Sequence, residues 1–139
     1  MEKQVIEKLI DTAIEQLKFS YAPYSNFKVG AALLAKKGTV YTGCNIENAA
    51  FTPTNCAERT AFFKAVSEGV HEFEAVCIVG GKEGILTEYA APCGVCRQVM
   101  MEFCNQDTFQ VILALDKEHY DVYTLHELMP QGFGPGNLA

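Results

Sequence analysis

Basic side chains are scarce in this 139-residue sequence, and long hydrophobic runs are absent. Lys and Arg number 11 against 17 Asp and Glu, so the formal net charge is −6, and the basic residues are not clustered. Contacts to the phosphates of a polynucleotide need a basic face, so we expect no nucleic-acid partner. No apolar run approaches the length that crosses a bilayer, so we expect no membrane partner either.

The sequence also lacks internal repeats, low-complexity tracts and linkers, which favours one compact domain over residues 1–139. Met1 to Gln4 run directly into an amphipathic pattern, without the features of a secretory signal. The six cysteines are therefore expected to be reduced thiols in the cytoplasm rather than disulfides.

Hydrophobic periodicity predicts helices and strands in alternation. The expected helices cover residues 5–20, 55–68 and 93–103, with a last short helix that Thr124 and Glu127 begin as a capping box. The expected strands cover residues 27–35, 40–44, 75–79, 109–115 and 121–123. Residues 80–84 should begin a long loop, and residues 128–135 should have no regular structure. Such alternation implies a sheet covered by helices on both faces.

Two short motifs carry the chemistry of this chain. They are Cys56-Ala57-Glu58 and Pro92-Cys93-Gly94-Val95-Cys96, and each lies at the start of a predicted helix. Together they supply three cysteines and a glutamate. Catalytic zinc takes three protein ligands and leaves a fourth position open. A helix start also favours the thiolate form of cysteine. The pattern C-x-E followed by P-C-x-x-C is that of zinc deaminases, with cysteine in place of their histidine.

Each motif alone has a simpler explanation. Glu58 follows Asn55 by three residues, as in a capping box, and Cys93-x-x-Cys96 is also typical of a structural zinc knuckle or a redox pair. A structural site needs a fourth ligand, and the remaining cysteines stand singly at positions 44, 77 and 104. Both motifs in this order favour catalytic zinc.

With these motifs, the loop at residues 21–25, the segment at residues 45–50 and the ending Phe133-Gly134-Pro135, the chain resembles the small homotetrameric cytidine deaminases over essentially its whole length. The resemblance implies a three-layer α/β/α sandwich with a five-stranded mixed sheet and one Zn²⁺ per chain. It further implies hydrolytic deamination of cytidine and 2′-deoxycytidine in pyrimidine salvage, in a homotetramer with active sites at the subunit junctions.

The resemblance also implies a role for particular residues. Zinc would be bound by Cys56, Cys93 and Cys96, whose thiolates Arg59 would hydrogen-bond, and Glu58 would carry both protons of the reaction. Phe27 would stack on the pyrimidine, and the backbone at Ala57 would read the base. Asn45 and Glu47 would bind the ribose 3′-hydroxyl, and Phe133 would contact the substrate from a neighbouring chain.

Other members of this fold, and one other class, are alternatives. Blasticidin-type aminonucleoside deaminases share C-A-E and P-C-x-x-C-R-Q, but their segment before the first cysteine does not resemble residues 45–50. Deaminases that edit RNA or DNA usually carry histidine as the first ligand and a basic surface. A non-catalytic, zinc-stabilised interaction module would not need Glu58. Phe51 stands where many cytidine deaminases have tyrosine, so a hydroxyl near the subunit junction is missing.

Overall fold

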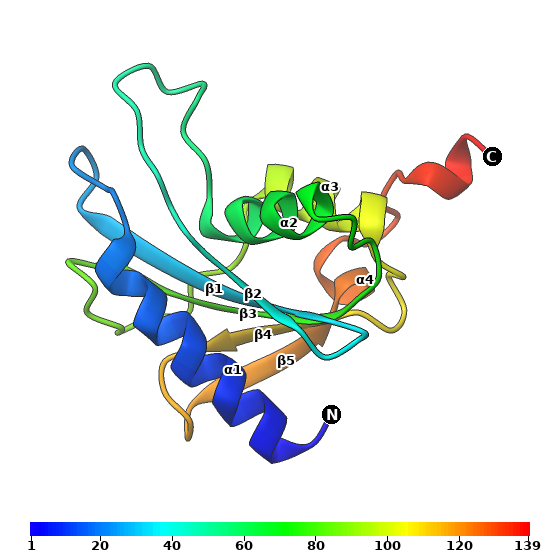
Figure 1. The fold of residues 1–139 in the computed structure, drawn as a ribbon, viewed down its shortest axis with the longest axis horizontal. Coiled ribbons are helices and arrows are strands. Elements are labelled where there is room, and N and C mark those ends of the chain that lie inside the picture. The colour runs from blue at the N-terminus through cyan, green and yellow to red at the C-terminus, as the bar shows by residue number, and fades with distance from the viewer.

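Five strands form one mixed sheet in the order β2-β1-β3-β4-β5 (Figure 1). The computed structural model describes residues 1–139. Its strands are β1 (Phe27–Ala35), β2 (Val40–Cys44), β3 (Phe73–Lys82), β4 (Gln110–Ala114) and β5 (Tyr120–Thr124). β3 and β4 run parallel, and the other neighbouring pairs are antiparallel. The predicted five-stranded mixed sheet is confirmed.

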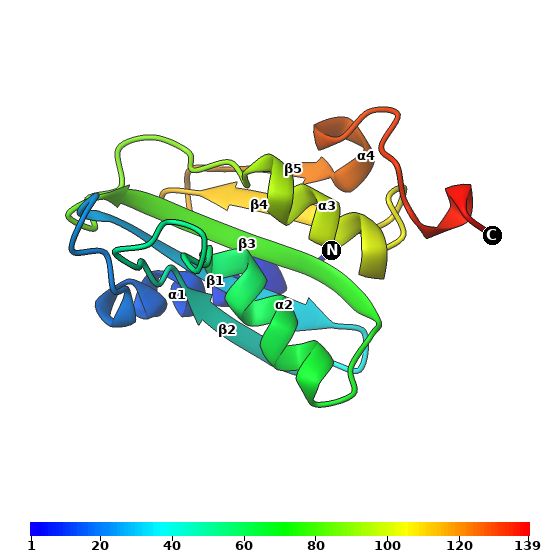
Figure 2. The ribbon, with the colours of Figure 1, turned by 90° about the horizontal axis from the view of Figure 1, so that it is seen from above.

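Helices cover both faces of the sheet. Helix α1 (Lys3–Glu15), which ends in a 3-10 turn over Gln16–Phe19, packs on one face. Helices α2 (Ala57–Ser67) and α3 (Gly94–Phe103) lie side by side on the other face (Figure 2), and the short α4 (Leu125–Leu128) follows β5. The three-layer sandwich is therefore also confirmed. None of the helices is long and apolar enough to cross a membrane.

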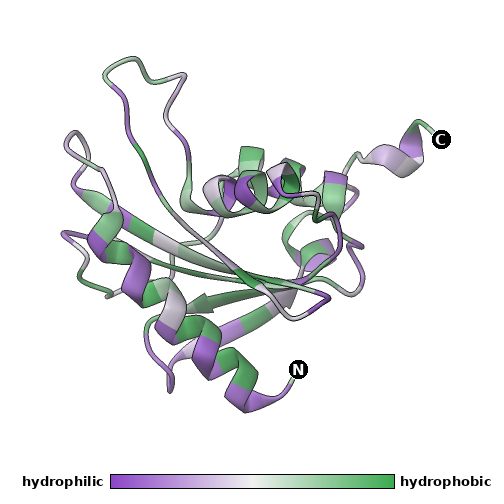
Figure 3. Ribbon diagram, viewed as in Figure 1, coloured by the Kyte–Doolittle hydropathy of each residue, from purple (hydrophilic) through white to green (hydrophobic).

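Each face of the sheet has its own hydrophobic core. Along β1, Ala31 and Leu33 join the cluster beneath α2 and α3, whereas Ala32 and Leu34 join the cluster beneath α1. Side chains alternate between the faces of a strand, so a strand buried on both sides is a nearly continuous apolar run. The helix α1 is apolar on one side only, and hydrophobic and hydrophilic bands alternate along its ribbon (Figure 3).

The connections place α2 and α3 so that they begin at the same edge of the sheet. Strands β2 and β3 both pair antiparallel with β1, so they run parallel to each other, and β3 in turn runs parallel to β4. The connections β2–α2–β3 and β3–α3–β4 are thus both crossovers between parallel strands. Such crossovers share one hand, which puts both helices on the same face. Ligands in open α/β sheets bind outside the carboxyl ends of such strands.

Glycines let the helices approach the sheet closely. A Cβ atom at Gly43 in β2 would lie 2.3 Å from the carbonyl oxygen of Ala57 and 2.7 Å from the amide nitrogen of Ala61. On the opposite face, a Cβ at Gly30 would lie 2.2 Å from the carbonyl oxygen of Ala13. Both helices therefore pack at a distance that only glycine permits. Gly43 determines how closely the first turn of α2 approaches the sheet.

Two expectations from the sequence need correction. Gly80 and Gly81 do not begin a loop, because β3 continues through Lys82. The glycines are needed because the returning chain lies against the strand: a Cβ at Gly81 would lie 1.9 Å from the carbonyl oxygen of Ile85. The C-terminal segment is irregular as expected only from Met129 to Gly134, since Leu128 ends α4 and Pro135–Asn137 form a 3-10 turn. The predicted capping box of Thr124 and Glu127 is confirmed.

We expect Gly43→Ala to lower the free energy of unfolding by about 1–3 kcal/mol, the usual cost of overpacking a tight contact. The added methyl group would push α2 away from β2. Urea denaturation followed by circular dichroism measures the change. Gly136→Ala is the matched control, because a Cβ at Gly136 meets nothing within 4 Å. Equal stability of the two variants would contradict the close-approach argument.

Candidate metal centre

Three cysteine sulfurs meet where α2 and α3 begin. The Sγ atoms of Cys56, Cys93 and Cys96 all lie within 4.8 Å of one another. The Sγ of Cys93 lies 3.7 Å from that of Cys56 and 3.4 Å from that of Cys96. Cys56 is the N-cap of α2 and Cys93 is the N-cap of α3. The two motifs that the sequence singled out are therefore brought together in space.

The surroundings of the cluster favour the thiolate form of Cys56. Two helix N-termini point their unpaired N–H groups and the positive ends of their dipoles at this place. The Arg59 guanidinium donates from Nη2 to the Cys56 sulfur at 3.2 Å, and its buried Nε has no partner within the chain. A hydrogen bond from Cys96 lowers the pKa of the Cys56 thiol, and Arg59 lowers it further, against the opposing effect of burial.

The cluster fits a zinc ion. Zn–S bonds of about 2.3 Å in a tetrahedral arrangement separate neighbouring sulfurs by about 3.8 Å, which is close to the two distances observed. The other cysteines lie outside the cluster. Burial raises the pKa of the Cys77 thiol to about 12, so that side chain stays protonated, as expected for a residue of the core. One Zn²⁺ per chain matches the three-thiol set.

Glu58 lies beside the cluster in a nearly dry position. The helix α2 begins with Cys56 as its N-cap, and no side chain caps it, so the alternative capping box of Asn55 and Glu58 is absent. The Glu58 side chain is 4% exposed and lines the cavity next to Cys56 and Cys93. Burial raises the pKa of this carboxyl to about 7. A carboxyl in such surroundings can take up and release a proton near neutral pH.

A cavity of about 270 Å³ opens over the cysteines and Glu58. Most of the residues predicted to act in the site line it, namely Phe27, Asn45, Glu47, Cys56, Ala57, Glu58 and Cys93. Cys96 is buried below, and Arg59 contacts the cluster from the side. The sequence reasoning did not find Val29, Thr54, Asn55, Ile78, Ala90 and Ala91, which complete the lining. Val29 carried a local signal, since it lies two residues after Phe27 on the same side of a strand.

Asn45 is held rigidly at one end of the cavity. Its Oδ1 accepts hydrogen bonds from the Val29 amide at 3.0 Å and from the Ser20 hydroxyl, and its Nδ2 donates to the Phe27 carbonyl at 2.7 Å. These partners fix which end of the carboxamide is the donor. One N–H of Nδ2 remains free of protein partners.

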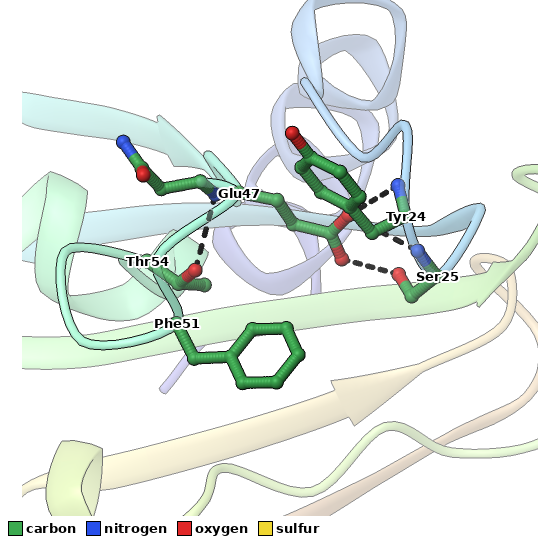
Figure 4. A pocket seen from close by; sticks show the side chains of 6 residues that line it. Tyr24, Ser25, Glu47, Phe51 and Thr54 are labelled. Carbon is green, nitrogen blue, oxygen red and sulfur yellow. Dashed lines mark hydrogen bonds between the residues drawn. The ribbon is translucent and has the colours of Figure 1, made fainter.

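Glu47 lies next to Asn45 and is held by the loop before β1. Its Oε1 accepts from the amides of Tyr24 at 2.9 Å and Ser25 at 3.1 Å, and its Oε2 accepts from the Ser25 hydroxyl (Figure 4). These bonds, the Ser25 hydroxyl first, lower the pKa of the Glu47 carboxyl, which therefore stays ionised as an acceptor. The strand β2 ends at Cys44, but Ile46 forms isolated bridges with Tyr21 and Asn55. This extended backbone lets Asn45 and Glu47 face the same cavity.

A second, more open cavity of about 380 Å³ adjoins the first through Glu47 and Thr54. The Phe51 ring extends beside it (Figure 4) and is 84% exposed. Phe133 lies elsewhere. It is 56% exposed and does not line the cavity of its own chain. The predicted site is thus brought together by one chain except for Phe133.

Comparisons with known proteins agree with this geometry. A family model described as "Cytidine and deoxycytidylate deaminase zinc-binding region" matches residues 3–112. The chain belongs to this deaminase family. The family description names zinc binding, and the Cys56, Cys93 and Cys96 cluster lies in the matched region.

Relatives and solved structures of the family cover nearly all of the chain. A cytidine deaminase of Sporosarcina psychrophila is 49% identical over 96% of this chain and 95% of its own length. One of Halalkalibacterium halodurans is 45% identical with the same coverage. The crystal structure of cytidine deaminase from Burkholderia pseudomallei covers 91% of this chain and 97% of its own, with a TM-score of 0.81 and 44% identity. These comparisons do not favour a blasticidin-type deaminase or a non-catalytic module.

We expect Cys93→Ala to lose zinc and to fold poorly, because two thiolates do not complete the three-ligand set. Elemental analysis of the purified protein measures the metal. The matched control is Cys104→Ala, which removes a half-buried thiol outside the cluster and should keep about one zinc per chain. Equal zinc loss in both variants would show that the ligand set is wrong.

Proposed function

We propose that this chain catalyses the zinc-dependent hydrolytic deamination of cytidine and 2′-deoxycytidine to uridine and 2′-deoxyuridine, with release of ammonia, in pyrimidine salvage. The observation that carries the proposal is the buried Glu58 beside three converging cysteines at the floor of a cavity. A purely structural zinc site needs no carboxyl at this place. The reduced thiols that the site requires support a cytoplasmic location.

The chain's own residues suit the proton transfers of this reaction. Zn²⁺ held by the three thiolates would supply an attacking water of lowered pKa. Glu58 takes a proton from that water and delivers it to N3 of the pyrimidine, which makes C4 more electrophilic. After the water oxygen has bonded to C4, Glu58 takes the remaining proton from that oxygen and delivers it to the exocyclic amine, so that a C4=O bond forms as the C4–N bond breaks and ammonia leaves. One carboxyl serves both transfers in this scheme, because Glu58 lines the cavity beside Cys56 and Cys93, where the water and the pyrimidine would both contact it.

Asn45 and Glu47 are suited to read one sugar hydroxyl. The free N–H of Asn45 is a donor and the ionised Glu47 is an acceptor, and both line the cavity. A hydroxyl can accept from the first and donate to the second at the same time, and we assign this role to the ribose 3′-hydroxyl. Phe27, 41% exposed at the cavity, would stack on the base, and the backbone at Ala57 would bind its polar edge.

The charge of the site favours a nucleoside over its phosphate. No Lys or Arg lines either cavity, and the ionised Glu47 lies in both. Phosphate groups are usually bound by Arg, Lys or helix N-termini, and here both helix N-termini are already turned toward the cysteines. The family description includes deoxycytidylate deaminases, whose substrate carries a phosphate. The lack of basic side chains in both cavities supports an uncharged nucleoside as the substrate of this chain.

We expect the purified protein to deaminate cytidine and 2′-deoxycytidine in an ultraviolet assay, and Glu58→Gln to lose about 10²–10⁴-fold in kcat. The amide cannot carry protons, although it can still hydrogen-bond, so zinc content and substrate binding should survive. Cytidine 5′-monophosphate in the same assay tests the preference for a neutral substrate. Glu58→Gln with more than about a tenth of the normal kcat would exclude its role as the proton carrier.

We further propose that the protein is a homotetramer in which Phe133 of one chain completes the site of another. Phe133 lies on the C-terminal segment and is 56% exposed outside its own cavity. Burial of exposed rings such as Phe133 and Phe51 by a second chain would stabilise an oligomer. Closure of the cavity by a neighbour would also exclude water and so strengthen each electrostatic interaction inside.

Complementation between two weak variants tests this arrangement. We expect Glu58→Gln and Phe133→Ala, refolded together, to regain activity above that of either variant refolded alone. In a mixed oligomer, some sites would combine Glu58 from one chain with Phe133 from another. If Phe133 serves its own chain, every mixed site lacks one of the two residues and no activity returns. That result, or a fully active monomer at assay concentration, would contradict the proposal.

A further inference from the structure

The segment after α4 is tied to the helix that carries two of the zinc ligands. Arg97 and Gln98 directly follow Cys96 in α3. The Arg97 guanidinium donates from Nη1 to the carbonyl of Leu128, and Gln98 donates from Nε2 to the carbonyl of Phe133 at 2.8 Å. Two successive side chains of α3 thus hold both ends of residues 128–133.

In addition to these hydrogen bonds, the backbone of the same segment packs closely against α3. A Cβ at Gly134 would lie 3.1 Å from the Cε of Met101, and one at Gly132 would lie 3.3 Å from the same atom. Met101 follows Gln98 by three residues, so the two share one side of the helix. Gln131 has φ 56°, which turns the chain just before this contact. The backbone at Phe133 is therefore fixed on α3.

The ring of Phe133 is accessible to solvent, whereas its backbone is held by a hydrogen bond. The carbonyl is bonded to Gln98, but the side chain is 56% exposed. A segment that only needed to cover its own domain would bury its large apolar ring and leave its backbone to water. Here the backbone is anchored and the ring is left accessible, as expected of a residue that is presented to another surface.

Arg97 connects this anchor to the metal site. Besides Leu128, it donates from Nε to the carbonyl of Pro92 at 2.8 Å. Pro92 immediately precedes the ligand Cys93, so one guanidinium contacts both the approach to the zinc ligand and the start of the C-terminal segment. The start of the C-terminal segment is thereby bonded to the same turn of α3 that follows Cys93 and contains Cys96.

We propose that Gln98 is a positioning residue for Phe133: its side-chain amide fixes the Phe133 carbonyl and so directs the ring to one place outside the domain. The inference rests on the proposed function for its catalytic consequence, because the ring matters to turnover only if it completes a neighbouring site. The anchoring itself is a property of the chain and has its own test. A neutral donor suits the task, because a carboxylate at this position would repel the carbonyl oxygen.

The absence of tryptophan from the sequence provides the direct test, since Phe133→Trp introduces a single tryptophan at the end of the segment, which can be excited without exciting the six tyrosines. In that background, Gln98→Met removes the donor at similar length and should lower the fluorescence anisotropy and increase quenching by acrylamide. Gln98→Lys keeps a donor and should restore both values. Glu102→Met is the matched control, an exposed position of the same helix that makes no hydrogen bond to the segment. Anisotropy and quenching unchanged by Gln98→Met would overturn the proposal.

Kinetics with the natural Phe133 then test the consequence for the reaction. We expect Gln98→Met to raise KM for cytidine by about two- to tenfold, the range for loss of one neutral hydrogen bond, with kcat and zinc content nearly unchanged. Combined with Phe133→Ala, it should add no further loss, because the anchor has nothing left to position. Additive losses would overturn the proposal, since Gln98 would then act on something else.

The two failures can be told apart. If Phe133→Ala leaves KM and kcat unchanged while Gln98→Met still loosens the tryptophan reporter, the anchor stands and the role of Phe133 in the site falls. If Phe133→Ala impairs turnover but Gln98→Met affects neither the reporter nor KM, the role of Phe133 stands and the anchor falls.

Discussion

The charge of three thiolates in one small volume is the constraint on which the rest of the structure depends. Cys56, Cys93 and Cys96 lie within 4.8 Å of one another, and like charges at this distance repel strongly unless they are compensated. The compensation comes from two helix N-termini, the Arg59 guanidinium and the metal. Because both helices must begin at one point, the fold needs two crossovers of the same hand, which leave the carboxyl ends of β2 and β3 on either side of β1.

The positions of the helices follow from small residues and not from large ones. Gly43 lets the first turn of α2 contact β2 at a distance that a methyl group would prevent, and Gly30 does the same for α1. Helix α2 is therefore positioned by backbone contact, which leaves little freedom for Cys56 and Glu58. On the substrate side, the corresponding rigidity comes from hydrogen bonds of the loop before β1, which hold Asn45 and Glu47 before any ligand arrives.

The sequence allowed most of the fold to be predicted because its signals are local. The bounds of β1 and β2 and the capping box at Thr124 follow from apolar alternation and turn residues, and the structure confirms them. The extension of β3 through Gly80 and Gly81 could not be read, because its cause is the backbone near Ile85 lying against them. For the site, the two motifs placed the three cysteines and Glu58. The partners of Asn45 and the contact of Gln98 with Phe133 were missed, because they join residues far apart in the chain.

The separation of the ligands along the chain has a consequence for how the protein folds. Cys56 and Cys93 are 37 residues apart, and β3, the strand between them, pairs with β1 on one side and with β4 on the other. Contacts of such sequence separation form slowly, because the entropic cost of closing a long loop comes before the favourable energy of the contact. The pairing partners of β3 are about as far apart in the sequence, and the three sulfurs meet only where the paired sheet brings the starts of α2 and α3 together. A complete set of three ligands is therefore a property of the folded chain, and zinc that binds this set adds its binding free energy to the stability of the fold.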